Sequence, residues 1–210
     1  MELQLALDLV DIPGAKEIVN EVAEYIDIVE IGTPIVINEG LRAVKELKEA
    51  FPSLRVLADL KIMDAGGYEV MKASEAGASI ITVLGVSDDS TIQGAVEEAK
   101  KQNTKVMVDM INVKNIEERA REIDQMGVDY ICVHSGYDHQ AAGISSFDDL
   151  LTIKRVVKQA KTAIAGGIKL STLPQAIAAG PDLVIVGGGI TSQENKRAVA
   201  SEMKQLVSQA

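Results

Sequence analysis

The chain has 210 residues and a formal net charge of −10 at pH 7, with 47% hydrophobic and 25% charged residues, a mixture typical of a soluble globular protein. This charge argues against nucleic acid or an anionic membrane surface as the main partner, although backbone N–H groups could still hold a phosphorylated small substrate. No segment reaches the roughly 18 apolar residues of a transmembrane helix. With no signal-peptide pattern and a single cysteine, Cys132, the sequence predicts a cytoplasmic protein.

Short aliphatic runs recur about every 25 residues along the chain. They do not alternate with polar residues, which is typical of strands that are covered on both faces. The eight runs are residues 3–8, 28–32, 55–61, 79–85, 105–111, 130–136, 161–167 and 183–190.

Amphipathic stretches between these runs predict helices over residues 15–25, 39–50, 68–75, 91–101, 116–126, 147–160, 173–179 and 193–208. Eight strand–helix units with short loops predict an α/β fold, a (β/α)8 TIM barrel that forms a single domain over residues 1–210. An open doubly wound sheet fits less well because no Gly-x-Gly-x-x-Gly follows the first strand; Leu-Val-Asp-Ile-Pro-Gly stands there instead.

Charged side chains gather where five of the predicted strands end, which is the edge of the barrel that carries active sites in this architecture. Asp59 and Lys61 are two apart on one strand and therefore point to the same side. Each of these residues alone could be a surface, capping or salt-bridge residue. Together they predict an active site made of Asp8, Glu30, Asp59, Lys61, Asp64, Asp109 and His134.

Glu30 and Asp59 come from neighbouring strands and predict a metal site. Two adjacent carboxylates repel each other unless one is protonated or a cation lies between them. Oxygen ligands without His or Cys suit Mg²⁺ or Mn²⁺ better than zinc. Lys61 can neutralise part of the remaining negative charge and donate to a developing oxyanion.

His134 at the end of the sixth strand is a candidate general acid or base, or else a histidine that is hydrogen-bonded within the rim. Cys132, two residues earlier, is interpreted as a small apolar filler inside the barrel, and His139 as part of a loop. Glycines end the seventh and eighth strands, where such barrels commonly hold phosphate. They predict a backbone phosphate site, with close turn packing as the alternative, at Gly166, Gly167, Gly187 and Gly188.

The segment Asp59-Leu60-Lys61-Ile62-Met63-Asp64 resembles the Asp-x-Lys-x-x-Asp motif of the orotidine 5′-monophosphate decarboxylase superfamily. Further segments resemble the 3-hexulose-6-phosphate synthase family within it, and the match runs essentially from end to end. These segments are residues 5–8, 29–34, 133–138, 163–168 and 184–190.

This resemblance implies a homodimeric, Mg²⁺-dependent aldehyde-lyase that joins formaldehyde to D-ribulose 5-phosphate through an enediolate and gives D-arabino-hex-3-ulose 6-phosphate. It implies metal ligation by Glu30 and Asp59, and enediolate stabilisation by Lys61. Asp64 would reach into the partner's site, and His134 would move the proton. Asp8 and Asp109 would bind substrate hydroxyls, and Gly167, Gly187 and Gly188 the phosphate.

Two other functions are considered. The related 3-keto-L-gulonate 6-phosphate decarboxylases tend to have a His-x-x-Arg pattern after strand six and Gly-Arg after strand eight. At these two places this chain has Tyr137 and Gly187-Gly188. Tyrosine does not replace the charge of arginine. A sugar-phosphate-binding regulatory protein would have no need of the intact Asp59, Lys61, Asp64 and His134. Whether formaldehyde would be assimilated or detoxified is left open by the sequence.

Overall fold

Eight parallel strands close into a barrel, in which each strand pairs with the next along the chain and β8 pairs with β1. The computed structural model describes residues 1–138 and 145–209. The strands are β1 (Glu2–Leu7), β2 (Ile28–Ile31), β3 (Arg55–Ile62), β4 (Ile80–Leu84), β5 (Lys105–Asp109), β6 (Tyr130–His134), β7 (Lys161–Ala165) and β8 (Leu183–Val186). All eight predicted strands and the predicted (β/α)8 barrel are confirmed.

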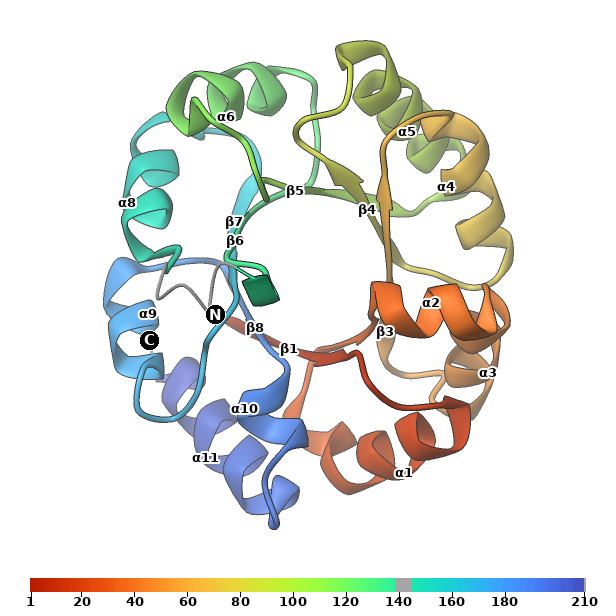
Figure 1. Cartoon of the computed structure of the whole chain (residues 1–210), viewed down its shortest axis with the longest axis vertical. Helices are drawn as coiled ribbons and strands as arrows, with labels where there is room; N and C mark the ends of the chain where they lie inside the picture. Colours follow the sequence, from red (N-terminus) through yellow and green to blue (C-terminus); the bar gives the residue numbers. More distant parts are fainter. Residues whose placement is uncertain (139–144, 210) are drawn as a thin grey trace.

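Helices surround the barrel, as Figure 1 shows. They are α1 (Ile12–Val22), the 3₁₀ turn η1 (Ala23–Tyr25), α2 (Thr33–Glu39), α3 (Arg42–Ala50), α4 (Gly66–Glu75), α5 (Asp89–Gln102), α6 (Ile116–Gln125), α8 (Phe147–Val156), α9 (Leu173–Ala179), α10 (Gly188–Thr191) and α11 (Lys196–Ser208). Among the described residues, no helix is both long and apolar enough to cross a bilayer.

The structure differs from the predicted helices in several places. Helix α1 begins three residues earlier than predicted, since the Asp11 side chain accepts from the Gly14 N–H at 2.9 Å and Pro13 occupies the first turn. Helix α2, which starts with Thr33 and Pro34 directly after β2, is absent from the prediction. Helix α11 starts at Lys196 rather than at residue 193, because Asn195 caps it through the Ala198 N–H.

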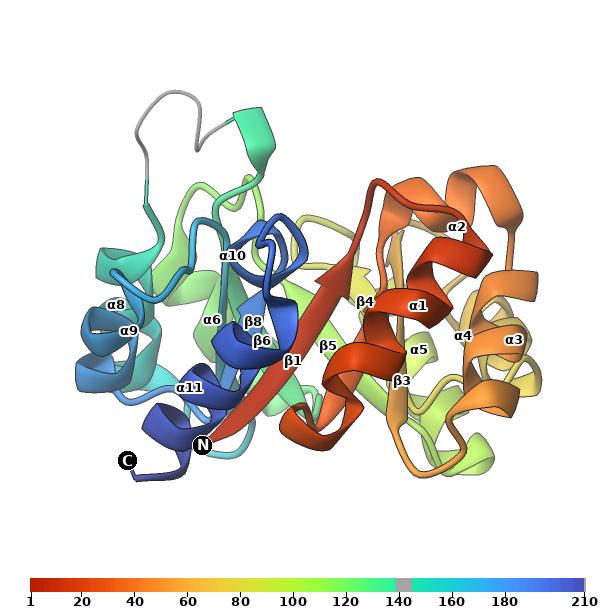
Figure 2. The same ribbon diagram turned by 90° about the horizontal axis from the view of Figure 1, so that it is seen from below.

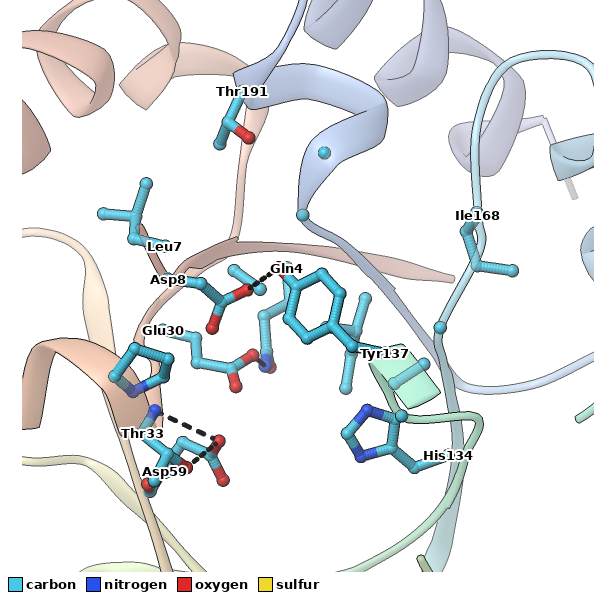
Figure 3. A pocket seen from close by; sticks show the side chains of 18 of the residues that line it. Gln4, Leu7, Asp8, Glu30, Thr33, Asp59, His134, Tyr137, Ile168 and Thr191 are labelled. Carbon is cyan, nitrogen blue, oxygen red and sulfur yellow. Dashed lines mark hydrogen bonds between the residues drawn. The ribbon is translucent and has the colours of Figure 1, made fainter. Parts of the chain in front are cut away.

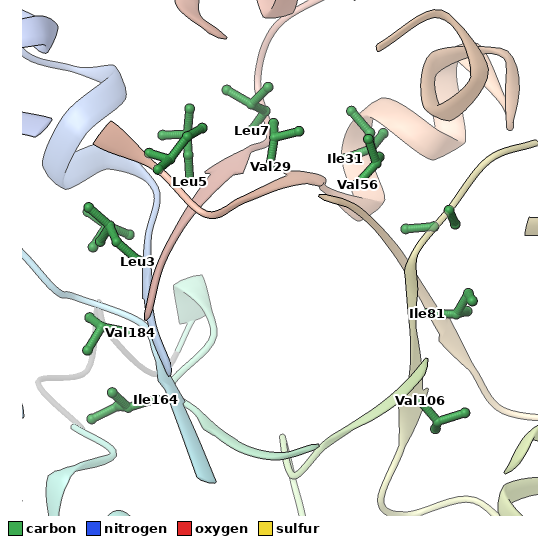
Figure 4. Close-up of a cluster of buried hydrophobic side chains, with 14 of the residues drawn as sticks. Leu3, Leu5, Leu7, Val29, Ile31, Val56, Ile81, Val106, Ile164 and Val184 are labelled. Atoms are coloured by element: carbon green, nitrogen blue, oxygen red, sulfur yellow. The ribbon is translucent and has the colours of Figure 1, made fainter. Parts of the chain in front are cut away.

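Two apolar layers build the core, one on each face of the barrel wall. The outer layer lies between strands and helices, and Figure 4 shows part of it, with Leu3, Leu5 and Leu7 of β1 pointing outward. The inner layer fills the barrel with residues such as Leu57 and Tyr130, both fully buried. Cys132 belongs to this inner layer, which confirms its interpretation as an apolar filler.

Strand β3 is irregular where its charged residues begin. Ala58 pairs with Ile81 and Ile62 pairs with Val83, so four steps along β3 match only two along β4. Within this bulge Lys61 adopts a left-handed backbone conformation with φ of 49°, and its N–H bonds the Thr82 hydroxyl at 2.9 Å. Such bulges re-aim side chains at barrel rims, and this one lies beside the site described below.

Helix α8 ends at Val156, four residues earlier than predicted, because a buried carboxylate from α6 organises the chain that follows. Asp124 is 4% exposed and accepts from the backbone N–H groups of Lys158, Gln159 and Ala160, with shortest distances of 2.8, 3.0 and 2.8 Å. These N–H groups are therefore paired with a side chain rather than with a continued helix.

Replacing Asp124 by Ala is expected to lower the free energy of unfolding by about 2–3 kcal/mol, because it removes the acceptor of several part-buried N–H groups. Asp124→Asn, which keeps one acceptor oxygen, should lose less. Urea unfolding of both variants measures this, with the exposed Glu49→Ala on α3 as a control expected within about 0.5 kcal/mol of wild type. Equal stability of Asp124→Ala and wild type would contradict it.

Candidate active site

A pocket of about 960 Å³ opens at the carboxyl ends of the strands, and residues from all eight strands or their following loops line it. In Figure 2 strand β1 rises towards this rim from the N-terminus at the lower edge. Figure 3 looks into the pocket and shows Asp8, Glu30, Asp59 and His134 around it. The structure thus brings together most of the site residues that the sequence predicts, with Lys61 and Asp109 also in the lining.

Asp59 is the most heavily bonded carboxylate in the pocket. It is 4% exposed, its Oδ1 accepts from the Thr82 hydroxyl at 2.8 Å, and its Oδ2 accepts from Thr33 Oγ1 at 2.7 Å and Lys61 Nζ at 2.5 Å. Strand β4 and the start of α2 therefore both fix its orientation. The N-terminus of the unpredicted helix α2 is part of the site for this reason.

Glu30 lies on the neighbouring strand and is 9% exposed. Burial and the nearby Asp59 raise the pKa of Glu30 well above its usual value. A divalent cation would favour the ionised form that burial disfavours, so this carboxylate pair fits a hard cation. No group of three or more His, Cys, Asp or Glu side chains in residues 1–138 and 145–209 is arranged to hold a metal, and Mg²⁺ commonly uses only one or two carboxylates.

Lys61, Asp109 and His134 form a connected charged group beside this pair. Lys61 Nζ lies 3.5 Å from Asp109 Oδ2, and His134 Nδ1 lies 2.8 Å from the same oxygen. Burial alone would lower the pKa of Lys61, but Asp59 and Asp109 outweigh it and raise that pKa. Burial would raise the pKa of Asp109, but His134 and Lys61 outweigh it and lower that pKa. Lys61 is thus an ammonium and Asp109 a carboxylate at neutral pH.

Asp8 is a further carboxyl group in the lining of the pocket. Its Oδ2 accepts from the Tyr137 hydroxyl at 3.1 Å, a contact that Figure 3 shows across the pocket. Burial raises the pKa of Asp8 despite this hydrogen bond. The carboxylate also needs Gly32 beside it, since a Cβ at that position would lie 2.1 Å from Asp8 Oδ1.

The predicted phosphate glycines line the pocket from the turns after β7 and β8, together with Lys169. Close packing explains Gly166, where φ is +96° and a Cβ would lie 2.2 Å from the Ser135 carbonyl oxygen. It does not explain Gly187 and Gly188, where a Cβ would meet its nearest atom at 3.6 and 3.5 Å. The open space beside these two glycines leaves their backbone accessible, as a phosphate site would need.

The structure does not bring Asp64 into the pocket of its own chain. Its side chain is exposed, and it accepts from the adjacent Ala65 N–H at 2.7 Å. Its predicted role in a partner's site stays a prediction. His139 lies outside the described residues.

Sequence reasoning missed the polar residues that hold the charged ones, namely Gln4, Thr33 and Thr82, and it also missed Lys169. Gln4 Nε2 donates to Glu30 Oε2 at 2.6 Å. The signal was present in β1, where positions 4, 6 and 8 share one face, so a polar Gln4 in an aliphatic run points to the same interior as Asp8. The role of Thr33 had no such signal, because it depends on the undetected helix.

The chain belongs to the orotidine 5'-phosphate decarboxylase / HUMPS family, whose model matches residues 1–203. It is 75% identical over 209 residues to a 3-hexulose-6-phosphate synthase of Bacillus subtilis (strain 168), with 100% of both chains covered. A crystal structure of 3-hexulose-6-phosphate synthase from Salmonella typhimurium superposes with a TM-score of 0.97 at 43% identity, covering 100% of this chain and 99% of that one. The predicted family and the predicted class of enzyme, an aldehyde-lyase, are confirmed.

The alternative relative is more distant. A crystal structure of a 3-keto-L-gulonate 6-phosphate decarboxylase (KGPDC) from Streptococcus mutans superposes with a TM-score of 0.91 over 99% of this chain and 97% of that one, but at 23% identity. This likeness shows the common fold alone.

The raised pKa of Glu30 predicts a pH-dependent stability in the absence of divalent cations. Between the usual glutamate value of 4.5 and the raised pKa, the folded chain keeps a proton that the unfolded chain releases. The wild type should therefore lose stability relative to Glu30→Gln as pH rises through this window, with a constant difference below it. Melting temperatures across a pH series with a chelator measure this difference. Parallel curves would contradict the prediction, and Glu17→Gln, exposed on α1, controls for the loss of a carboxylate.

Proposed function

We propose that this protein catalyses the Mg²⁺-dependent condensation of formaldehyde with D-ribulose 5-phosphate to D-arabino-hex-3-ulose 6-phosphate, as a cytoplasmic homodimer in the ribulose monophosphate pathway. The observation that carries the proposal is the buried Glu30–Asp59 pair with the Lys61 ammonium 2.5 Å from Asp59. The 75% identity to a 3-hexulose-6-phosphate synthase over the whole chain supports the choice of reaction.

The reaction first needs removal of a proton from C1 of ribulose 5-phosphate, which leaves an enediolate. Lys61 can stabilise that negative charge, since its ammonium lines the pocket and stays charged between two carboxylates. His134 moves the proton: Asp109 bonds its Nδ1, which leaves Nε2 as the ring nitrogen for the substrate. The carbon then attacks formaldehyde, and a proton returned to the new hydroxyl completes the product.

Glu30 and Asp59 would hold Mg²⁺, which supplies positive charge to the substrate oxygens when it is bound. Asp8 and Asp109 would orient substrate hydroxyls. Gly166, Gly167, Gly187 and Gly188 would bind the phosphate through their backbone N–H groups, with Lys169 adding a positive charge on the same side of the pocket. The phosphate would thus lie at the turns after β7 and β8, whereas Glu30 and Asp59 come from β2 and β3.

One residue weighs against the decarboxylase alternative. Tyr137 occupies the position where an arginine would suit a substrate carboxylate, and its hydroxyl is bonded to Asp8. Tyrosine brings no positive charge to that part of the pocket. Because the two reactions pass through the same kind of enediolate, we still expect a low decarboxylase activity.

The purified protein should consume formaldehyde in the presence of ribulose 5-phosphate and Mg²⁺. This consumption should stop when a chelator removes the metal. Lys61→Ala should lower kcat by about 100-fold or more, with a much smaller effect on sugar-phosphate binding, because the ammonium acts mainly on the developing charge. Formaldehyde loss and isothermal titration measure the two effects. Release of CO2 from 3-keto-L-gulonate 6-phosphate without formaldehyde consumption would move the assignment to the decarboxylase.

Variants of Asp64 test whether the active site is shared between subunits. Mixing two inactive variants distinguishes an Asp64 that acts in the partner's site from one that acts in the site of its own chain. In a heterodimer of Lys61→Ala and Asp64→Ala chains, one site would keep its own Lys61 and receive the partner's intact carboxylate. Refolding the two variants together should then restore about a quarter of wild-type activity for random dimer formation. No recovery, with dimers verified by sedimentation, would place the role of Asp64 within its own chain or outside catalysis.

A further inference from the structure

Gln4 is a fully buried polar side chain in the wall of the pocket, and no step of the proposed reaction involves it. It is 0% exposed, and it lines the pocket from β1. Its amide nitrogen donates to Glu30 Oε2 at 2.6 Å. Figure 3 shows the two side chains next to each other inside the barrel.

The amide oxygen of Gln4 differs from every other buried side-chain polar atom among the described residues. This atom, Oε1, is the one buried side-chain nitrogen or oxygen in residues 1–138 and 145–209 that has no hydrogen-bond partner. Burying a polar group in this way costs about 1–3 kcal/mol. An apolar residue would avoid that cost, so the position of Gln4 in a strand whose other buried residues are all aliphatic calls for a function.

The register of the strands explains why Gln4 is the residue that holds Glu30. Glu30 pairs with Ala6 on β1, and Gln4 pairs with Ile28. Ala6 and Ile28 both belong to the apolar inner layer and have no group to bond a carboxylate. Gln4 therefore approaches Glu30 from deeper in the barrel, and it fixes one carboxylate oxygen at that side.

The two carboxylates of the pair are held in matching ways. Asp59 is oriented by the Thr82 and Thr33 hydroxyls, and Glu30 by the Gln4 amide, its one side-chain hydrogen-bond partner in the described part of the chain. A metal ligand without such support rotates among several positions, and supporting hydrogen bonds are worth about 10- to 100-fold in metal affinity.

We propose that Gln4 is a positioning residue for the divalent cation: its amide N–H₂ holds Glu30 Oε2, so that the remaining oxygen of Glu30 faces the cation. The buried Oε1 has no hydrogen-bond partner among the described residues, so the contact that this amide makes is the one that holds Glu30. This inference rests on the proposed metal-dependent function and assigns a residue to it.

Mn²⁺ binding to the substrate-free protein tests this inference without reference to turnover. The free ion is measured by electron paramagnetic resonance for wild type, Glu30→Gln and Gln4→Met, which keeps the side-chain length and removes both polar atoms. Wild type should bind Mn²⁺ and Glu30→Gln should not. Gln4→Met should bind at least about tenfold more weakly, and its half-saturating Mg²⁺ concentration in the activity assay should rise by the same factor.

Thr162→Val is the matched control, since it also deletes a hydrogen bond from a buried side chain to a carboxylate. The Thr162 hydroxyl donates to Asp182 Oδ2 at 3.0 Å, and Thr162 does not line the pocket. It should bind Mn²⁺ like wild type. Melting curves without metal establish that each variant is folded, and Gln4→Asn, which keeps both polar atoms one bond shorter, is the second variant if Gln4→Met does not fold.

The possible outcomes distinguish a failure of the role of Gln4 from a failure of the proposed metal-dependent function. Wild-type Mn²⁺ affinity in folded Gln4→Met or Gln4→Asn would overturn the role of Gln4 and leave the metal-dependent reaction intact. Absence of Mn²⁺ binding in the wild type itself would overturn the proposed metal site, and the inference with it. Equal weakening in Gln4→Met and Thr162→Val would show a general loss of barrel stability and would also overturn the inference.

Discussion

The interaction on which the site depends is the contact of one ammonium with two buried carboxylates. Lys61 lies 2.5 Å from Asp59 and 3.5 Å from Asp109, in a pocket that also contains Glu30 and Asp8. One ammonium cannot balance four carboxyl groups, and burial makes unpaired charge costly. The result is a high pKa at Glu30, an unusual strand conformation at Lys61, and a set of hydroxyl and amide donors around the acids. The high pKa and the surrounding donors follow from gathering negative charge inside a barrel, and the strand conformation places Lys61 among the acids.

The order of the strands divides the barrel mouth into two halves with different chemistry. The carboxylates come from β1, β2, β3 and β5, whereas the glycine-rich turns follow β7 and β8, with His134 of β6 between them. An anionic phosphate placed on the acidic half would be repelled, but on the glycine half it meets backbone N–H groups and Lys169. In the proposed reaction a sugar phosphate would therefore span the pocket, with its phosphate at the glycine-rich turns and its reactive carbons beside Lys61 and His134.

Much of this arrangement could be predicted from the sequence, because it depends on period and position. Residues at the strand ends of a parallel barrel converge whatever their distance in the chain, so Asp8 and Asp109 could be predicted to line the same pocket as Asp59. The end of α8 was not, since it depends on Asp124, a carboxylate 34 residues away from the first N–H group that it accepts. Nor was Tyr137 predictable as a partner of Asp8, because that contact crosses the pocket between residues 129 positions apart.

The bulge in β3 shows why the motif around Lys61 needs three-dimensional support. A regular strand would continue its hydrogen bonds to β4 through Asp59 and Lys61, but here the Lys61 N–H bonds the Thr82 hydroxyl, which in turn donates to Asp59. A left-handed lysine costs about 1 kcal/mol or more, and the Thr82 contact compensates by pairing the released N–H. Thr82 thus joins the backbone of one charged residue to the side chain of the other. A substitution there would disturb the ammonium and the carboxylate together, although Thr82 carries no charge itself.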